Sequence, residues 1–262
     1  MPYADVRGQR LYYQDSGGNG PAVVFSHGFL MDNRMFDHQV RVLRDTHRVI
    51  CWDERGFGQT EWKREAFSYW DSADDLFGLL DHLGVEKAIL GGMSQGGFLS
   101  LRAALRAPER VRGLVLISTQ AGIDPPEVIA GYKQMMDTWL GMGPIDPLVE
   151  SIASIILGPD KSHWEPWVSD WRKGEKEDFK WPTLCLLERD DITERVSQIQ
   201  APALLIHGMA DNAIPMARAE QLMSLLPNAR DLVRVEGAAH APNLTHPDAV
   251  NPAIVSFCTS LG

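Results

Sequence analysis

Short apolar runs that do not alternate with polar residues constrain the fold of this 262-residue chain most strongly. A strand buried on both faces of a parallel sheet has this pattern, because its successive side chains point into two equally apolar layers. Such runs predict buried strands at Ala22–Ser26, Arg48–Trp52, Ala88–Leu90, Leu114–Ile117 and Ala203–Ile206, and a further strand is predicted at Asp231–Val235.

Helical patterns lie between these runs. The clearest begins near Asp71, where leucines from Leu76 to Leu83 recur at i, i+3, i+4 and i+7, and where Ser72 and Asp75 form a Ser-x-x-Asp start signal. Further helices are predicted around Phe98–Leu105, Met216–Leu226 and Pro247–Leu261. Strands that alternate with helices predict an α/β fold with a mostly parallel sheet flanked by helices.

The middle of the chain, residues 121–194, lacks the short buried strands. It contains five of the eight tryptophans, namely Trp139, Trp164, Trp167, Trp171 and Trp181. We expect a helical cap here, inserted into a core formed by residues 1–120 and 195–262. The aromatic content favours an apolar substrate pocket to which Trp139, Trp164 and Trp167 contribute, although packing of the cap onto the core explains the same composition equally well.

Composition excludes several classes of partner. The net charge of −10, without a dense Lys/Arg cluster, excludes nucleic acid and anionic membranes as expected partners. Cys51, Cys185 and Cys258 have no metal-ligand or disulfide-framework spacing and suit a reducing compartment. No signal peptide or long apolar span is evident, so we expect a cytoplasmic protein without a metal, with its possible homo-oligomerisation left open.

A Gly-x-Ser-x-Gly motif at 92–96 follows one predicted strand and precedes a predicted helix. A sharp strand-to-helix turn needs small residues on both sides of the serine, because the backbone segments approach closely there. The turn lifts the Ser94 hydroxyl above the sheet. We therefore predict that Ser94 is a nucleophile.

A serine nucleophile needs a base and a carboxylate that orients the base. His240 lies in a small-residue loop after the strand Asp231–Val235, which places it over the carboxyl edge of the sheet. Asp211 follows the strand Ala203–Ile206 and is the predicted acid, with Asp124 as the alternative. The predicted catalytic order is Ser94, Asp211, His240.

An oxyanion hole needs two N–H groups aimed at one point. The backbone N–H groups of Phe29 and Gln95 are the predicted donors, since one follows the strand Ala22–Ser26 and the other opens a helix. Gly28 allows the backbone to approach the substrate. Asp53 and Arg55 are interpreted as a pair that braces the next loop.

These features occur in one order along the chain: His27-Gly28-Phe29, Asp53-x-Arg55-Gly56-x-Gly58, Gly92-x-Ser94-x-Gly96-Gly97, the Asp211 loop and His240. The set resembles the α/β-hydrolase superfamily over nearly the whole chain outside the predicted cap. The resemblance implies the α/β-hydrolase fold, a site that needs no cofactor and a mobile lid. Serine at 94 differs from the aspartate nucleophile of the epoxide hydrolase and haloalkane dehalogenase branches.

Within the superfamily, the segments 237–251 and 74–84 resemble 3-oxoadipate enol-lactonases. The site and the resemblance together predict hydrolysis of a small carboxylic ester or lactone through an acyl-enzyme. Three alternatives use the same triad: hydrolysis of a C–C bond, cofactor-free perhydrolysis, and a ligand receptor with slow turnover.

Overall fold

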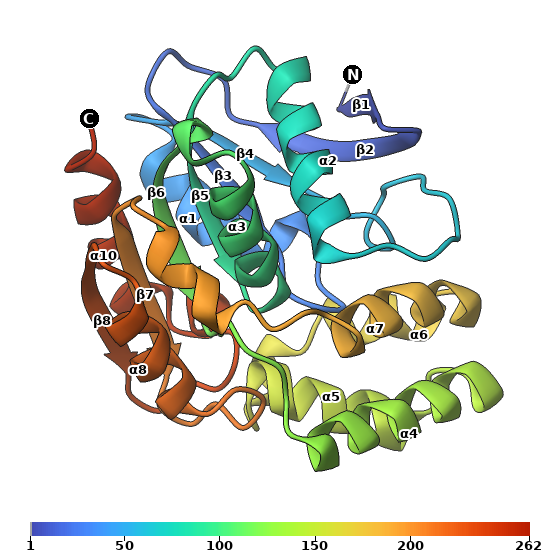
Figure 1. Ribbon diagram of the computed structural model, residues 1–262. Helices are drawn as coiled ribbons and strands as arrows, with labels where there is room; N and C mark the ends of the chain where they lie inside the picture. Colours follow the sequence, from blue (N-terminus) through green and yellow to red (C-terminus); the bar gives the residue numbers. More distant parts are fainter. Residues whose placement is uncertain (1) are drawn as a thin grey trace.

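A computed structural model describes residues 2–262 and contains one eight-stranded sheet (Figure 1). The strand order is β1-β2-β4-β3-β5-β6-β7-β8. The strands are β1 Tyr3–Val6, β2 Gln9–Asp15, β3 Ala22–Ser26, β4 Arg48–Trp52, β5 Ala88–Met93, β6 Val111–Ile117, β7 Ala203–Gly208 and β8 Ala229–Val235. Strand β2 pairs antiparallel with β1 and with β4, and all other neighbouring strands are parallel. The predicted mostly parallel sheet is therefore confirmed.

The register of the central strands brings several loops to one edge of the sheet. Ser26 at the end of β3 pairs with Trp52 at the end of β4 and with Gly92 near the end of β5. The loops that follow these three strands therefore emerge side by side, which is where ligands bind in open α/β sheets.

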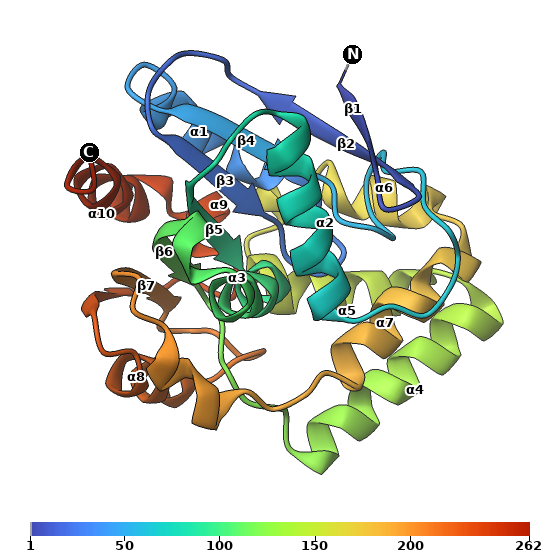
Figure 2. The same ribbon diagram turned by 45° about the horizontal axis from the view of Figure 1, so that its top comes forward.

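Helices cover both faces of the sheet (Figures 1 and 2). They are α1 Asp37–Leu43, α2 Tyr69–His82, α3 Gln95–Arg106, α8 Met216–Leu225, α9 Pro242–Thr245 and α10 Pro247–Thr259. Alternate residues of β3 belong to two different apolar clusters, one on each face of the sheet. Val24 belongs to the cluster with α2, α3 and α8, whereas Val23 and Phe25 belong to the cluster with α1 and α10. This double burial explains why the strand sequences carry no polar alternation.

Helix α2 begins one turn earlier than its sequence pattern suggests. Ser68 is the N-cap, and it forms a capping box with Asp71 in which each side chain bonds the other residue's backbone N–H. Ser72 and Asp75 repeat the same Ser-x-x-Asp spacing four residues later, but both are buried inside the helix. The predicted start signal was therefore the wrong one of two equivalent candidates.

Between β6 and β7 the chain is helical and lies across the carboxyl edge of the sheet (Figures 1 and 2). Its helices are α4 Pro126–Met142, α5 Asp146–Leu157, α6 Trp167–Lys173 and α7 Lys180–Leu187. Short 3₁₀ turns occupy Asn33–Phe36, Pro108–Arg110, Lys161–His163, Lys176–Phe179 and Thr193–Gln198. We call residues 121–194 the cap. Its two ends touch, because the Ile192 N–H donates to the Ala121 carbonyl at 3.2 Å.

Across residues 2–262, no helix combines the length and the apolar character needed to span a membrane.

Candidate active site

Ser94 sits at a strained turn between β5 and α3. Its φ of 52° is unusual for a residue with a side chain and is typical of functional sites that hold backbone strain. A Cβ on Gly92 would approach the Gly96 backbone to 2.1 Å, and a Cβ on Gly96 would approach the Ser26 carbonyl oxygen to 2.0 Å. Only glycine fits at both flanking positions, as the motif predicts.

His240 and Asp211 form a buried pair beside this turn. The His240 Nδ1 lies 2.7 Å from the Asp211 Oδ2, and Asp211 Oδ1 accepts the backbone N–H groups of Ala213 and Ile214 at 2.8 and 2.9 Å. Burial alone would raise the pKa of Asp211, but the adjacent His240 and the Ile214 N–H lower the pKa below its usual value. A charged Asp211 requires the proton of His240 on Nδ1 and leaves Nε2 free to accept one.

Two further residues show why Asp211, and not Asp124, is the partner of His240. Asp124, the alternative, accepts hydrogen bonds from Gln120 at 2.7 Å and from Arg189 at 2.8 Å, and it makes no contact with His240. His207 packs behind Asp211, with Nε2 at 2.8 Å from the Ile214 carbonyl oxygen. Burial lowers the pKa of His207, so it is a neutral donor at Nε2.

A cavity of about 460 Å³ contains both Ser94 and His240 in its wall. Phe29 and Met93 come from the core, and one stripe of α4 adds Val128, Tyr132 and Met135 at i, i+4 and i+7. The cap adds further aliphatic residues to the wall, namely Leu148, Ile152, Ile155, Ile156 and Leu186. The cavity suits a ligand with an apolar group.

Of the two predicted oxyanion donors, Phe29 belongs to the wall of this cavity, whereas Gln95 does not but directly follows Ser94, which does. Gln95 is the first residue of α3, so its N–H has no acceptor within the helix. Within residues 2–262, neither N–H has a hydrogen-bond partner. Gly28 is buried and does not line the cavity; its N–H donates to the Met35 sulfur at 3.2 Å. Its predicted contact with substrate is therefore corrected to a packing role.

The loop after β4 holds the Phe29 loop in place. The Asp53 carboxylate accepts the Asn33 backbone N–H at 2.8 Å and the Gln59 N–H at 2.7 Å. His27 donates from Nδ1 to the Gly28 carbonyl and accepts the Glu54 N–H at Nε2. Burial lowers the pKa of His27, which keeps the ring neutral as this pattern requires. His27 is thus structural.

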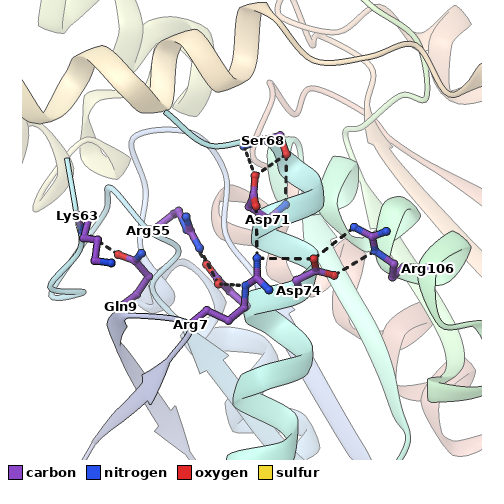
Figure 3. A network of polar contacts seen from close by, with 9 residues as sticks. Arg7, Gln9, Arg55, Lys63, Ser68, Asp71, Asp74 and Arg106 are labelled. Carbon is purple, nitrogen blue, oxygen red and sulfur yellow. Dashed lines mark hydrogen bonds and ion pairs between the residues drawn. The ribbon is translucent and has the colours of Figure 1, made fainter. Parts of the chain in front are cut away.

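A buried ion pair anchors the same loop to α2. The Arg55 guanidinium donates to both oxygens of Asp75 at 2.6 and 2.7 Å. Figure 3 shows Arg55 directed toward the helix, where Arg7 and Arg106 extend the network through Asp71 and Asp74. Asp53 and Arg55 therefore do not pair with each other as predicted; each braces the loop through other partners, Asp53 through Asn33 and Gln59 and Arg55 through Asp75.

The cap tryptophans are a correction to the sequence prediction. Trp139, Trp164 and Trp167 do not line the cavity at Ser94. Trp139 stacks on Phe179 with ring centroids 4.4 Å apart, and Trp164 donates to the Gly158 carbonyl at 2.9 Å. Trp139 and Trp167 line a separate hollow of about 480 Å³. All three are buried in the apolar layer that joins the cap to the core, so the packing alternative holds.

Sequence reasoning missed the residues that do form the cap side of the cavity. Val128, Tyr132 and Met135 share one face of α4, and that helical spacing was a usable signal. Burial, followed by the Asp124 charge, raises the pKa of Tyr132 to about 12, so its hydroxyl stays protonated. Asn212 and Arg218, after β7, were also missed.

The chain belongs to the α/β-hydrolase fold family, whose model matches residues 21–247. Polyketide synthase ThaQ of Burkholderia thailandensis is 32% identical over 92% of this chain, but the match spans only 12% of that protein. A putative non-heme chloroperoxidase of Synechocystis sp. is 28% identical, over 98% of this chain and 99% of its own.

Two solved structures have the same fold over their full length. The enol-lactonase of Burkholderia xenovorans superposes with a TM-score of 0.88 at 28% identity, covering 98% of this chain and 100% of that one. The malate-bound esterase of Thermogutta terrifontis superposes with a TM-score of 0.86 at 27% identity, covering 100% and 97%. The resemblance to α/β-hydrolases with enol-lactonase-like relatives is confirmed.

Proposed function

We propose that this protein hydrolyses small carboxylic esters or lactones through a covalent acyl-enzyme on Ser94. One observation carries the proposal: Ser94, at positive φ, shares an apolar cavity with a histidine whose far nitrogen is bonded to a buried carboxylate. An esterase and an enol-lactonase among the similar structures support the same reaction class.

In this mechanism, His240 Nε2 removes the Ser94 proton as Oγ attacks the carbonyl carbon. Asp211 stabilises the imidazolium that forms, and the Phe29 and Gln95 N–H groups bind the oxyanion. The imidazolium then protonates the leaving alcohol oxygen. When the substrate is a lactone, this alcohol stays attached to the acyl group on Ser94. His240 next takes a proton from a water molecule as that water attacks the acyl carbon. The acid is then released from Ser94, and His240 returns the proton to the Ser94 oxygen.

The test compares wild type with Ser94→Ala on p-nitrophenyl acetate, butyrate and octanoate. Ser151→Ala is the matched control, since Ser151 lines the same cavity from the cap and has no part in the mechanism. We expect turnover that is lost in Ser94→Ala and kept in Ser151→Ala. Equal rates in wild type and Ser94→Ala would contradict the proposal.

A second candidate is perhydrolysis, in which hydrogen peroxide replaces water as the acyl acceptor. The similarity to a putative non-heme chloroperoxidase favours testing it. Peracid formation from acetate and peroxide, lost in Ser94→Ala and faster than ester hydrolysis, would favour this activity. Ester hydrolysis without peracid formation would exclude it.

A further inference from the structure

One cationic side chain stands in the otherwise mostly apolar wall of the cavity. Arg218, in the first turn of α8, lines the cavity beside Asn212 and Pro215. Among residues 2–262, the only hydrogen bond of its guanidinium is an exposed one from Nη2 to the Ile123 carbonyl oxygen at 3.3 Å, and the guanidinium forms no ion pair. Most other arginines of the chain are paired with carboxylates.

The one carboxylate in the same wall is already compensated. Asp124 accepts from Arg189, which is buried behind the wall, and from Gln120. Asp211 is bonded to His240 and does not line the cavity. The remaining polar groups that face the space, such as the Tyr132 hydroxyl and the Ser151 hydroxyl, are neutral. Arg218 is therefore the one charged side chain of this wall that forms no ion pair among the described residues, and the neighbouring Asp191 carboxylate is exposed and lies outside the wall.

We propose that Arg218 binds a carboxylate of the substrate, which makes the substrate an ester or lactone that also carries a free carboxylate. This inference rests on the proposed function and specifies its substrate class. A guanidinium without an ion-pair partner, in the wall of a mostly apolar cavity, gains a charge-assisted bidentate bond when a carboxylate enters. The aliphatic wall from α5 then packs around the hydrocarbon between that carboxylate and the reacting carbonyl.

The experiment uses two pairs of esters with matched shape. Monoethyl glutarate is compared with ethyl 5-methylhexanoate, which replaces the acyl-side carboxylate by an isopropyl group. Acetoxyacetate is compared with isobutyl acetate, which makes the same replacement on the alcohol side. Acid release is followed by pH-stat at pH 7.5 for wild type, Arg218→Gln, Arg218→Lys and the control Arg41→Gln, which removes an exposed arginine on α1.

We expect wild type to prefer the carboxylate member of one pair by about 10- to 100-fold in kcat/KM, the usual worth of a hydrogen bond to a charged group. Arg218→Gln removes this preference, Arg41→Gln keeps it, and Arg218→Lys keeps part of it. The neutral esters change by less than about twofold, because Arg218 does not touch the triad. High salt weakens the preference.

The inference is overturned if neither carboxylate ester is preferred while both neutral esters are hydrolysed, or if Arg218→Gln keeps the preference. Failure of the proposed function is distinct, since the neutral esters would then show no Ser94-dependent turnover. In that case, calorimetric titration of monoethyl glutarate into wild type and Arg218→Gln still decides the matter. Binding that is equal in both, or absent from both, overturns the inference.

Discussion

Removing one partner of the Arg55–Asp75 pair should destabilise the protein far more than removing both. The Asp75 side chain is 0% exposed and the Arg55 side chain 7%, so Arg55 is left buried and without an ion pair when Asp75 is lost, whereas Asp75 without Arg55 keeps an ion pair with the partly exposed Arg7 at 3.3 Å. Burial raises the pKa of Asp75 more than the Arg55 guanidinium lowers it, so the net shift is upward. Desolvation therefore outweighs the attraction, and the pair as a whole adds little stability.

We expect Asp75→Leu alone to lower the free energy of unfolding by about 3–5 kcal/mol, the usual cost of an unpaired buried charge. Arg55→Met should lower it by less, because Arg7 still contacts the Asp75 carboxylate. The double variant should lose at least about 2 kcal/mol less than the sum of the two single losses. Urea unfolding followed by far-ultraviolet circular dichroism measures all four proteins. Additive losses in the double variant would refute the reasoning.

Three further changes test other parts of the structure. Asp211→Asn should lower kcat on p-nitrophenyl butyrate by about 10⁴-fold, because an amide holds the wrong tautomer of His240; a loss below tenfold would exclude Asp211 as the acid. Burial raises the pKa of Glu54 well above its usual value, so the folded chain keeps a proton that the unfolded chain releases. Stability of the wild type should therefore fall relative to Glu54→Gln as pH rises from 5 to 8, by up to about 1.4 kcal/mol per pH unit, and a pH-independent difference in urea unfolding would contradict this. Trp139→Ala should cost about 3–5 kcal/mol of unfolding free energy with little change in KM, and a raised KM at unchanged stability would return Trp139 to the substrate pocket.

The parallel strands were predictable because a strand buried on both faces has a short, continuous apolar run in its own sequence. Ala22–Ser26 and Arg48–Trp52 match β3 and β4 to the residue, since polar residues, glycine or proline bound each apolar run. The antiparallel strands β1 and β2 were not predicted. Only half-buried, they mix polar and apolar residues, and a run of this kind resembles a loop.

The chemical centre was predictable for a different reason. Gly92, Ser94 and Gly96 are tied together by steric limits within five residues, and Asp211 and His240 each follow a recognisable strand. The cap side of the site was not predictable from composition. A tryptophan in the sequence indicates a buried side chain, but it does not indicate which part of the protein that side chain contacts. The packing of α4 on α7 decides which face of α4 lines the cavity.

The hydrogen bond between Ile192 and Ala121 joins the two ends of the cap, so the cap is an insertion that leaves and re-enters the core at one point. Its entrance and exit lie against each other, so a segment of another length or sequence can be joined there without moving any strand of the sheet. The wall of the cavity can therefore change by exchange of about one quarter of the chain while Ser94, Asp211 and His240 stay in place. Leu186 of α7 packs into the apolar core, so an exchanged cap must keep an apolar side chain at this position.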